Sequence, residues 1–330
     1  MLYASCAACA LILVKDTHGS FSYGDGVPTS PLILSGALWR SQPAWSVRAG
    51  ACFALTKPRL AAMSILSTMA AYATARPESG PLWATVIGTT LAAGGALSLN
   101  QWWERRTDAM MQRTQGRPLP QAMISPAEAL AWSIMLSVGG VGLFLAMVNG
   151  AAAILAAATI IIYGVIYTPL KRRTRWATEI GAISGALPAL LGNAAAGDLA
   201  SRPGLVLTAV LLFWQMPHFF AIGWRHRADY QAAGFPLLPA VDPTGRRTAV
   251  WSLCYSIGLV IVSLPPWAFG WLGLTYGLIT TASNLWFLRA AYSFISDGDR
   301  DRAARKLFFA SIFYLPLVMG ALIVDRLLAG

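Results

Sequence analysis

Long apolar segments recur along the chain from Leu60 onward, separated by short polar stretches. Most approach the length of about 20 residues with which a helix crosses a bilayer. Inside lipid, a spanning segment must satisfy its own backbone hydrogen bonds, which a helix does. The pattern therefore predicts an all-α polytopic membrane protein. Nine transmembrane helices are expected, at residues 60–75, 82–103, 127–148, 151–169, 178–196, 205–224, 250–268, 271–293 and 307–328.

The first 50 residues do not follow this pattern. Residues 1–14 are apolar but short for a span, and no basic segment precedes them as it would in a signal peptide. Residues 15–50 are rich in Gly, Ser and Pro, which is typical of loops. We expect residues 1–50 to be a loose, non-essential leader and residues 51–330 to form a single transmembrane domain.

The placement of charge supports a membrane topology. Only 12% of the residues are charged, against about 25% in soluble domains. The net charge of +11 is carried by short loops between the apolar segments, so we predict no nucleic-acid partner. With nine spans, the basic clusters of the tail and the loops alternate onto one side. The positive-inside rule makes this side, and the N-terminus, cytoplasmic. The loops of the other side carry only Arg76, Arg202 and Arg326.

A polar group ends the second predicted span. Asn100, Glu104 and Asp108 are four residues apart, so on a helix they share one face along about 12 Å of its axis. Oxygen ligands of this kind suit Mg²⁺, and nearby arginines such as Arg113 and Arg117 suit the phosphates of a substrate. The alternative is a solvated helix end. Against it, two acids at i,i+4 cost a helix about 0.2–0.5 kcal/mol without a compensating ligand.

Other polar residues on the basic side have two interpretations each. Lys171, Arg172 and Arg173 suit phosphate or carboxylate binding, or serve only as positive-inside anchors. Asp229 could supply a further oxygen to a metal, or form a local pair with Arg225. His218 lies within a span, where an ionisable residue is either a functional candidate or a hydrogen-bonded packing residue.

Taken together, these stretches resemble the protohaem IX farnesyltransferases, or haem O synthases, of the UbiA-type intramembrane prenyltransferases. The resemblance implies nine helices around a central cavity with a polar site on the cytoplasmic side. It implies transfer of a farnesyl group from farnesyl diphosphate, bound through Mg²⁺, to a vinyl group of haem B, which gives haem O. The matching pieces are Leu55–Arg59, Asn100–Pro118, Tyr167–Thr174, Gly185–Pro188, Trp214–His218, Asp229–Tyr230 and Gly234–Pro236.

The resemblance also implies roles for particular residues. Asn100, Glu104 and Asp108 match the first acidic motif, and Asp229 matches the acid of the second. These four would be the catalytic metal ligands. The basic positions expected near the diphosphate or the haem propionates are Arg113, Arg117, Lys171 and Arg172, and His218 is a candidate for the haem pocket. Two positions depart from the pattern, Ala189 in place of a proline and Ala233 in place of a glycine.

Other functions remain open from the sequence alone. The same fold would serve a prenyltransferase for a quinone precursor or a chlorophyll-type acceptor. A transporter is a different class, but the acids gather at one membrane face and no internal repeat is visible. The absence of an Arg- and Ser-rich presequence favours a bacterial inner membrane over a mitochondrial one. The expected partners are haem B, farnesyl diphosphate, the bilayer and a haem A synthase or oxidase assembly proteins.

Overall fold

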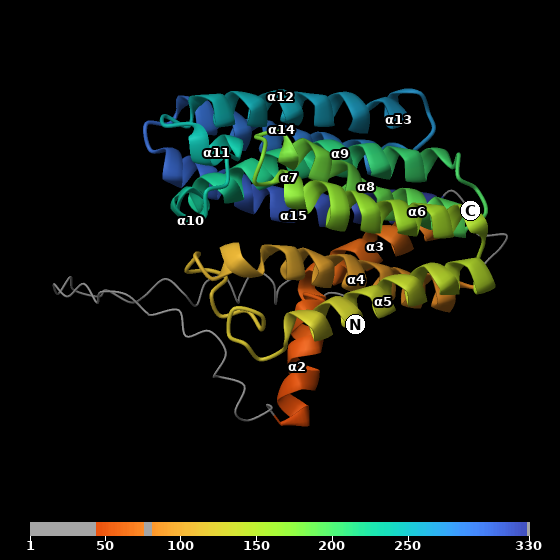
Figure 1. Ribbon diagram of the computed structural model, residues 1–330. Coiled ribbons are helices and arrows are strands. Elements are labelled where there is room, and N and C mark those ends of the chain that lie inside the picture. The colour runs from red at the N-terminus through yellow and green to blue at the C-terminus, as the bar shows by residue number, and fades with distance from the viewer. Residues whose placement is uncertain (1–43, 76–80, 329–330) are drawn as a thin grey trace. The chain divides into compact units, whose positions relative to one another are not determined.

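A computed structural model describes residues 44–75 and 81–328 of the chain, and every regular element among them is a helix (Figure 1). The predicted leader falls mostly on residues 1–43, outside the described part. Its last residues are helical, because α2 begins at Trp45. The elements are α2 (Trp45–Leu55), α3 (Pro58–Thr74), α4 (Leu82–Asp108), α5 (Pro126–Met147), α6 (Gly150–Ile160), η1 (Ile161–Tyr167), α7 (Thr168–Leu170), α8 (Ala177–Ala195), α9 (Arg202–Arg225), α10 (Arg227–Ala232), α11 (Leu238–Val241), α12 (Arg246–Ser263), α13 (Pro265–Ala268), α14 (Leu274–Ser296) and α15 (Arg300–Leu328).

The all-helical, membrane-type architecture predicted from the sequence is confirmed. Within the described residues, six helical segments are long and apolar enough to cross a membrane. They are α4, α5, the continuous α6–η1–α7 segment, α9, α12 with α13, and α15. The other three predicted spans coincide with α3, α8 and α14, of which α3 has only 17 residues. The count of nine spans therefore stays a prediction.

Small residues allow the long helices to pack side by side. The pairs α4 and α5, α14 and α15, and α9 with α8 and α12 lie against each other along their lengths (Figure 1). A Cβ atom at Gly140 on α5 would lie 2.6 Å from the backbone nitrogen of Ala92 on α4. In lipid, where van der Waals packing drives association, glycine permits this close approach.

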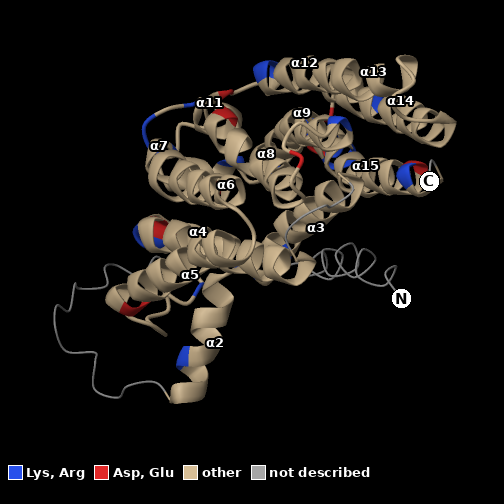
Figure 2. Cartoon of the chain, turned by 90° about the vertical axis from the view of Figure 1, so that its right-hand side faces the viewer, with Lys and Arg blue, Asp and Glu red and all other residues tan. Residues whose placement is uncertain are grey.

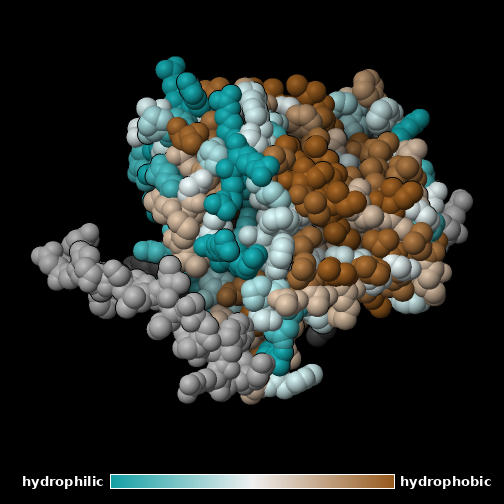
Figure 3. Space-filling view, in the orientation of Figure 1, coloured by the Kyte–Doolittle hydropathy of each residue, from teal (hydrophilic) through white to brown (hydrophobic). Residues whose placement is uncertain are grey.

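Polar and apolar surfaces are separated along the bundle. Hydrophilic residues gather at the end where α10 and α11 lie, and hydrophobic residues cover the middle of the visible face (Figure 3). Viewed from the opposite end, the helices carry few charged residues (Figure 2). The connections after α4, α7, α9 and α14 all fall at the hydrophilic end, which fits the predicted alternation of basic loops.

A π-helix interrupts one long helix just before the basic loop. In η1 the turns are wider than in an α-helix, and such segments often occur at functional sites. The hydroxyl of Thr168 donates to the carbonyl oxygen of Tyr163, five residues earlier, at 2.7 Å. This local geometry fixes Thr168 and leads directly into Lys171, and both side chains reach toward α4.

Candidate functional site

The polar end of α4 is buried. Asn100, Glu104 and Asp108, called here the α4 site, expose 1%, 8% and 0% of their surfaces. A helix end in contact with solvent would leave these side chains hydrated, so the solvated-end alternative does not describe this structure. Buried carboxylates require partners, because removing an ion from water costs several kcal/mol without compensation.

Arg117 is the partner of Asp108. Its Nη1 donates to both carboxylate oxygens of Asp108, at 2.8 and 2.7 Å. The same nitrogen lies 3.9 Å from Oε2 of Glu104. One guanidinium therefore bridges the two acids. The loop that follows α4 brings Arg117 back onto the helix, and the hydroxyl of Thr114 donates to the Asp108 carbonyl at 2.9 Å.

The other two members of the α4 site each contact a lysine. Lys57 Nζ donates to Oδ1 of Asn100 at 2.7 Å, and Lys171 Nζ donates to Oε1 of Glu104 at 2.9 Å. Asn100 in turn donates from Nδ2 to the hydroxyl of Thr168 at 3.1 Å. The α4 site thus joins α4 to the start of α3 and to the end of α7.

Lys57 was not singled out as a site residue from the sequence, although it lies within the Leu55–Arg59 piece of the resemblance. Its backbone is left-handed, with φ 46° and ψ 66°, where it caps α3 before Pro58. A non-glycine residue in this region is strained, and such strain is concentrated at functional sites. Burial, together with the nearby Arg117, lowers the pKa of Lys57 to about 7.

Lys171 has the opposite electrostatic balance. Burial by itself would lower its pKa, but the Glu104 carboxylate and nearby tyrosine hydroxyls raise the pKa of Lys171 well above its ordinary value. Its ammonium also lies 4.8 Å from the ring centroid of Tyr167. Lys171 is therefore a permanent cation held beside the acids, which exceeds what membrane anchoring alone requires.

A cavity of about 390 Å³ opens beside the α4 site. Glu104 contributes to its wall, so a ligand in the cavity would meet one of the predicted acids directly. Arg172 and Arg173, two of the three basic residues predicted for phosphate or carboxylate binding, both lie on it. Two aromatic rings complete a mixed lining. The residues around it are Trp103, Glu104, Thr107, Thr168, Pro169, Arg172, Arg173 and Phe235.

Asp229 and Arg113 lie in a neighbouring group. Asp229 Oδ2 is 4.0 Å from Nδ1 of His226, and the Arg113 guanidinium is 6.0 Å from the ring centroid of Tyr230. Burial and the nearby Arg113 lower the pKa of His226. Asp229 does not form the alternative ion pair with Arg225, because the guanidinium of Arg225 lies over the ring of Phe308. Within the described part of the chain, Asp229 forms no hydrogen bond or ion pair with the α4 site.

Tyr230 and a small apolar cluster connect the two groups. Tyr230 is among the residues that influence the pKa of Lys171. Met111, Ala177 and Phe235 pack together between the loop after α4 and the segment after α10. Asp229 lies on α10, and the segment that follows α10 reaches the same cavity through Phe235.

His218 lies elsewhere, between α9 and α15. Its ring is stacked between Trp214 and Phe308, with centroids 5.1 and 5.3 Å away. Its Nδ1 is 2.7 Å from the hydroxyl of Ser311. That hydroxyl donates its single proton to the carbonyl of Phe308 at 2.6 Å, so it accepts the bond from His218. The Nδ1 atom therefore carries the proton, and Nε2 carries the lone pair.

The donor set of the α4 site suits magnesium. Two carboxylates and an amide oxygen are hard ligands, and Mg²⁺ commonly uses one or two carboxylates together with substrate phosphates. Among the described residues, no group of three or more His, Cys, Asp or Glu side chains gathers at one point. A cation at the α4 site would therefore need further oxygens from a ligand.

Comparison with known proteins agrees with this fold and site. The UbiA prenyltransferase family matches residues 61–313. The chain belongs to this family of prenyltransferases. Within the family, it is similar to proteins named protoheme IX farnesyltransferase. The one from Opitutus terrae is 46% identical over 83% of this chain and 93% of its own length. The one from Solibacter usitatus is 40% identical over 82% and 97%. The resemblance predicted from the sequence is confirmed.

Solved structures show the same fold at low sequence identity. A digeranylgeranylglyceryl phosphate synthase matches with a TM-score of 0.70 and 17% identity, covering 84% of this chain and 98% of that one. A UbiA homolog from Archaeoglobus fulgidus, bound to DMAPP and Mg²⁺, matches with a TM-score of 0.59 and 15% identity over 82% and 98%. The protein is thus an integral membrane protein of the UbiA fold.

Proposed function

We propose that the protein transfers the farnesyl group of farnesyl diphosphate to a vinyl group of haem B, giving haem O. The observation that carries the proposal is the α4 site, in which three oxygen-bearing side chains are each held by a separate cation beside a cavity. The relatives named protoheme IX farnesyltransferase share 40–46% of their residues with this chain over most of its length. No feature of the site favours a quinone precursor or a chlorophyll-type acceptor.

The charges around the α4 site favour a polyanionic ligand. Glu104 and Asp108 are paired with two cations, Lys171 and Arg117, and a third basic group, Lys57, contacts Asn100 beside them. The guanidinium groups of Arg172 and Arg173 add to this excess on the cavity wall. A diphosphate would accept hydrogen bonds from the cations, and charge-assisted bonds of this kind are about twice as strong as neutral ones.

Mg²⁺ is the cofactor that fits, with Asn100, Glu104 and Asp108 as its protein ligands and Asp229 as a further candidate. Bound with the diphosphate, it would neutralise charge that develops on the leaving group. A solved relative of the same fold is bound to DMAPP and Mg²⁺. The chain's own contribution is to release Lys171 and Arg117 from the acids, so that both can hold the diphosphate oxygens.

The departure of diphosphate leaves an allylic cation that must be kept from water. The aromatic rings of Trp103 and Phe235 and the ring of Pro169 line the cavity and exclude solvent from part of its wall. A haem vinyl group then supplies the electron pair to the farnesyl carbon. The new carbon–carbon bond leaves a cation on the vinyl carbon next to the porphyrin, and a water molecule adds its oxygen there and loses a proton, which completes the hydroxyethyl group.

His218 is the residue best prepared to meet the haem. A histidine that binds a metal through one ring nitrogen commonly donates a hydrogen bond from the N–H of the other to a fixed acceptor. This bond sets the tautomer. Ser311 provides this acceptor, and the lone pair on Nε2 is left for iron. Near the hydrophilic end of the same helix pair, Arg225 lies over Phe308 and provides a positive charge for a haem propionate.

The proposed topology completes the assignment. Nine spans around the cavity, with the α4 site and the N-terminus on the cytoplasmic side, follow from the alternation of basic loops. A bacterial inner membrane is the proposed location. The proposed partners beyond the substrates are a haem A synthase or oxidase assembly proteins. That residues 1–50 are dispensable stays a prediction, tested by deleting them.

The direct test is to incubate membranes containing the protein with haem B, farnesyl diphosphate and Mg²⁺. Haem O formation, measured by mass spectrometry, is the expected result. Membranes from cells that lack the protein are the control. The proposal would fail if the prenyl group were transferred to another acceptor in preference to haem B, or if no prenylated haem formed.

A further inference from the structure

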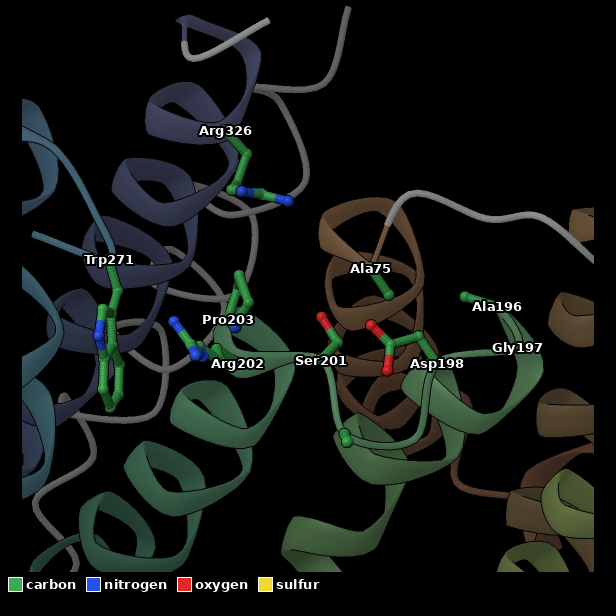
Figure 4. Close-up of a pocket in the computed structure, with 10 residues that line it drawn as sticks. Ala75, Ala196, Gly197, Asp198, Ser201, Arg202, Pro203, Trp271 and Arg326 are labelled. Atoms are coloured by element: carbon green, nitrogen blue, oxygen red, sulfur yellow. The ribbon is translucent and has the colours of Figure 1, made fainter.

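A second and larger cavity lies at the other end of the bundle, away from the α4 site. Its volume is about 680 Å³, and it is bounded by the turn between α8 and α9, the end of α3 and the end of α15 (Figure 4). Of these helices, α3 begins beside the α4 site, where Lys57 contacts Asn100. The lining includes Asp198, Ser201, Arg202, Trp271 and Arg326. We call it the arginine cavity.

Most of the positive charge predicted for this side lies in the arginine cavity. Its predicted loops hold only three Lys or Arg residues, and two of them, Arg202 and Arg326, line the cavity. The guanidinium of Arg202 lies 5.1 Å from the ring centroid of Trp271. Neither arginine has a salt bridge within the described part of the chain. Scattered positive-inside exceptions would not be expected to converge on one cavity.

Arg326 carries an unsatisfied donor. Its Nε is buried and has no hydrogen-bond partner among the described residues. A buried charged donor without an acceptor costs more than an ordinary unpaired group, so such a position indicates a missing partner. An anionic group in the arginine cavity would supply the acceptor.

The frame around this donor is rigid. The neighbouring Asp325 accepts hydrogen bonds from the backbone nitrogens of Gly273 and Tyr276, at 2.7 and 3.4 Å. These bonds tie the end of α15 to the start of α14, and Trp271 lies just before that start. The wall that carries Arg326 is thereby fixed relative to the segment of Trp271, whose ring the Arg202 guanidinium contacts.

The opposite wall carries the other sign. In Figure 4, Trp271 and Arg202 lie on one side, Asp198 lies on the other, and Ser201 lies between them with its hydroxyl toward the cavity. Two guanidinium groups and one carboxylate around a single space suit a ligand with both an anionic and a cationic group. A purely anionic ligand would be repelled by Asp198.

Large aromatic side chains are exposed beside the cavity. Phe269 and Trp271, beside it on the α13–α14 connection, expose 69% and 46% of their surfaces. Exposed aromatic residues of this kind occur in the headgroup region of bilayers. A ligand of mixed charge available at that depth is the headgroup of a phospholipid.

We propose that the arginine cavity binds the headgroup of a phosphatidylethanolamine. Arg202 and Arg326 hold the phosphate, and Asp198 accepts hydrogen bonds from the primary ammonium. Phosphatidylcholine has the same charges but no N–H donor, so it leaves Asp198 without a bond. The site is separate from the prenyl-transfer chemistry and serves to fix the ends of α9, α14 and α15 in the membrane.

The test is native mass spectrometry of the full-length protein released from vesicles of equal phosphatidylethanolamine, phosphatidylcholine and phosphatidylglycerol content. We expect phosphatidylethanolamine to be retained at least about fivefold over phosphatidylcholine. Arg326→Gln should reduce its retention about tenfold. Asp198→Asn should remove the preference over phosphatidylcholine while binding of a phosphate group persists. Arg247→Gln, an exposed arginine at the other end of the bundle, is the matched control and should change nothing.

Three outcomes would overturn the proposal. The first is equal retention of the three lipids. The second is that Arg326→Gln and Arg247→Gln have equal effects on lipid retention. The third is that inorganic phosphate saturates the site and phosphoethanolamine does not displace it. If Arg326→Gln fails to fold, competition on the unaltered protein decides the question. Free phosphoethanolamine should then displace the retained lipid at lower concentration than phosphocholine, and equal displacement would contradict the assignment.

Discussion

The two ends of the helix bundle use charge in opposite ways. At the α4 site, Asp108 and Glu104 are buried and each is matched by a cation at salt-bridge distance. At the arginine cavity, Arg326 has a buried nitrogen with no partner among the described residues, and the only carboxylate on the lining, Asp198, has no ion pair there. At one end the buried carboxylates are paired without a ligand, and at the other a buried donor is left unpaired.

This difference suggests different relations between ligand and protein. A ligand that enters the α4 site must exchange partners with existing ion pairs, so its binding depends on a metal to take over the acids. A ligand in the arginine cavity only adds contacts. Exchange of partners is suited to a reaction cycle, in which substrate binds and product leaves, whereas addition of contacts is suited to a lipid that stays.

The largest expected effect is at the acids. Replacing Asp108 with Ala should reduce haem O formation by about 100-fold or more, because it removes a proposed metal ligand and leaves Arg117 without its partner. Activity of the purified, inserted protein is the measurement. Asp297→Ala is the matched control, since Asp297 is also paired with a basic residue, Lys306, but lies in an exposed loop. Full activity of Asp108→Ala would refute the metal role.

Exchange of partners predicts coupling between metal and diphosphate. We expect Mg²⁺ to tighten binding of an unreactive farnesyl diphosphate analogue by about tenfold or more, and the analogue to tighten Mg²⁺ binding equally. Calorimetric titration of each ligand, with and without the other, measures both factors. In Glu104→Gln the coupling should shrink, because Lys171 is no longer held by an acid. Independent binding of the two ligands would show that the ion pairs are not exchanged.

A smaller effect is expected at His218. Replacement by Ala should shift the Soret band of bound haem, and Ser311→Ala should cause a weaker change by releasing the Nδ1 hydrogen bond. His218→Phe preserves stacking between Trp214 and Phe308 and is the control for packing. A haem spectrum that is the same in all three variants and the unaltered protein would remove His218 from the haem site.

The smallest effect on catalysis should come from the arginine cavity. Arg202→Gln should change the rate of haem O formation by less than about twofold, since Arg202 lies at the opposite end of α9 from Arg225. The same assay on Asp108→Ala supplies the contrast. A loss comparable to that of Asp108→Ala would show that the two ends are coupled and would end the distinction drawn between them.

Much of the fold is encoded locally. Apolar segments long enough to cross a bilayer must be helical, and the helix ends observed at Leu82, Pro126 and Arg202 lie within a few residues of those predicted. The helical spacing of Asn100, Glu104 and Asp108 also placed them on one face without any tertiary information. Hydropathy could not decide the number of spans, because α3, α8 and α14 are helical but fall outside the six candidate spans.

The partners of these residues required the tertiary structure. Lys57 is 43 residues from Asn100, and Lys171 is 67 residues from Glu104, so no periodicity connects them. No periodicity connects His218 with Ser311 either, and the hydrogen bond between them decides which ring nitrogen of His218 is free. Asp229, predicted by resemblance, lies in a neighbouring group because the chain turns after α9.

The sequence by itself determined the helices, the side on which positive charge gathers and the face of α4 that carries the acids. These follow from short-range geometry and from the cost of polar groups in lipid. Only the tertiary structure decided which cation pairs with which acid, and that Arg202 and Arg326 face one cavity. Such pairings depend on how distant helices pack, and packing is a property of the whole bundle rather than of any segment.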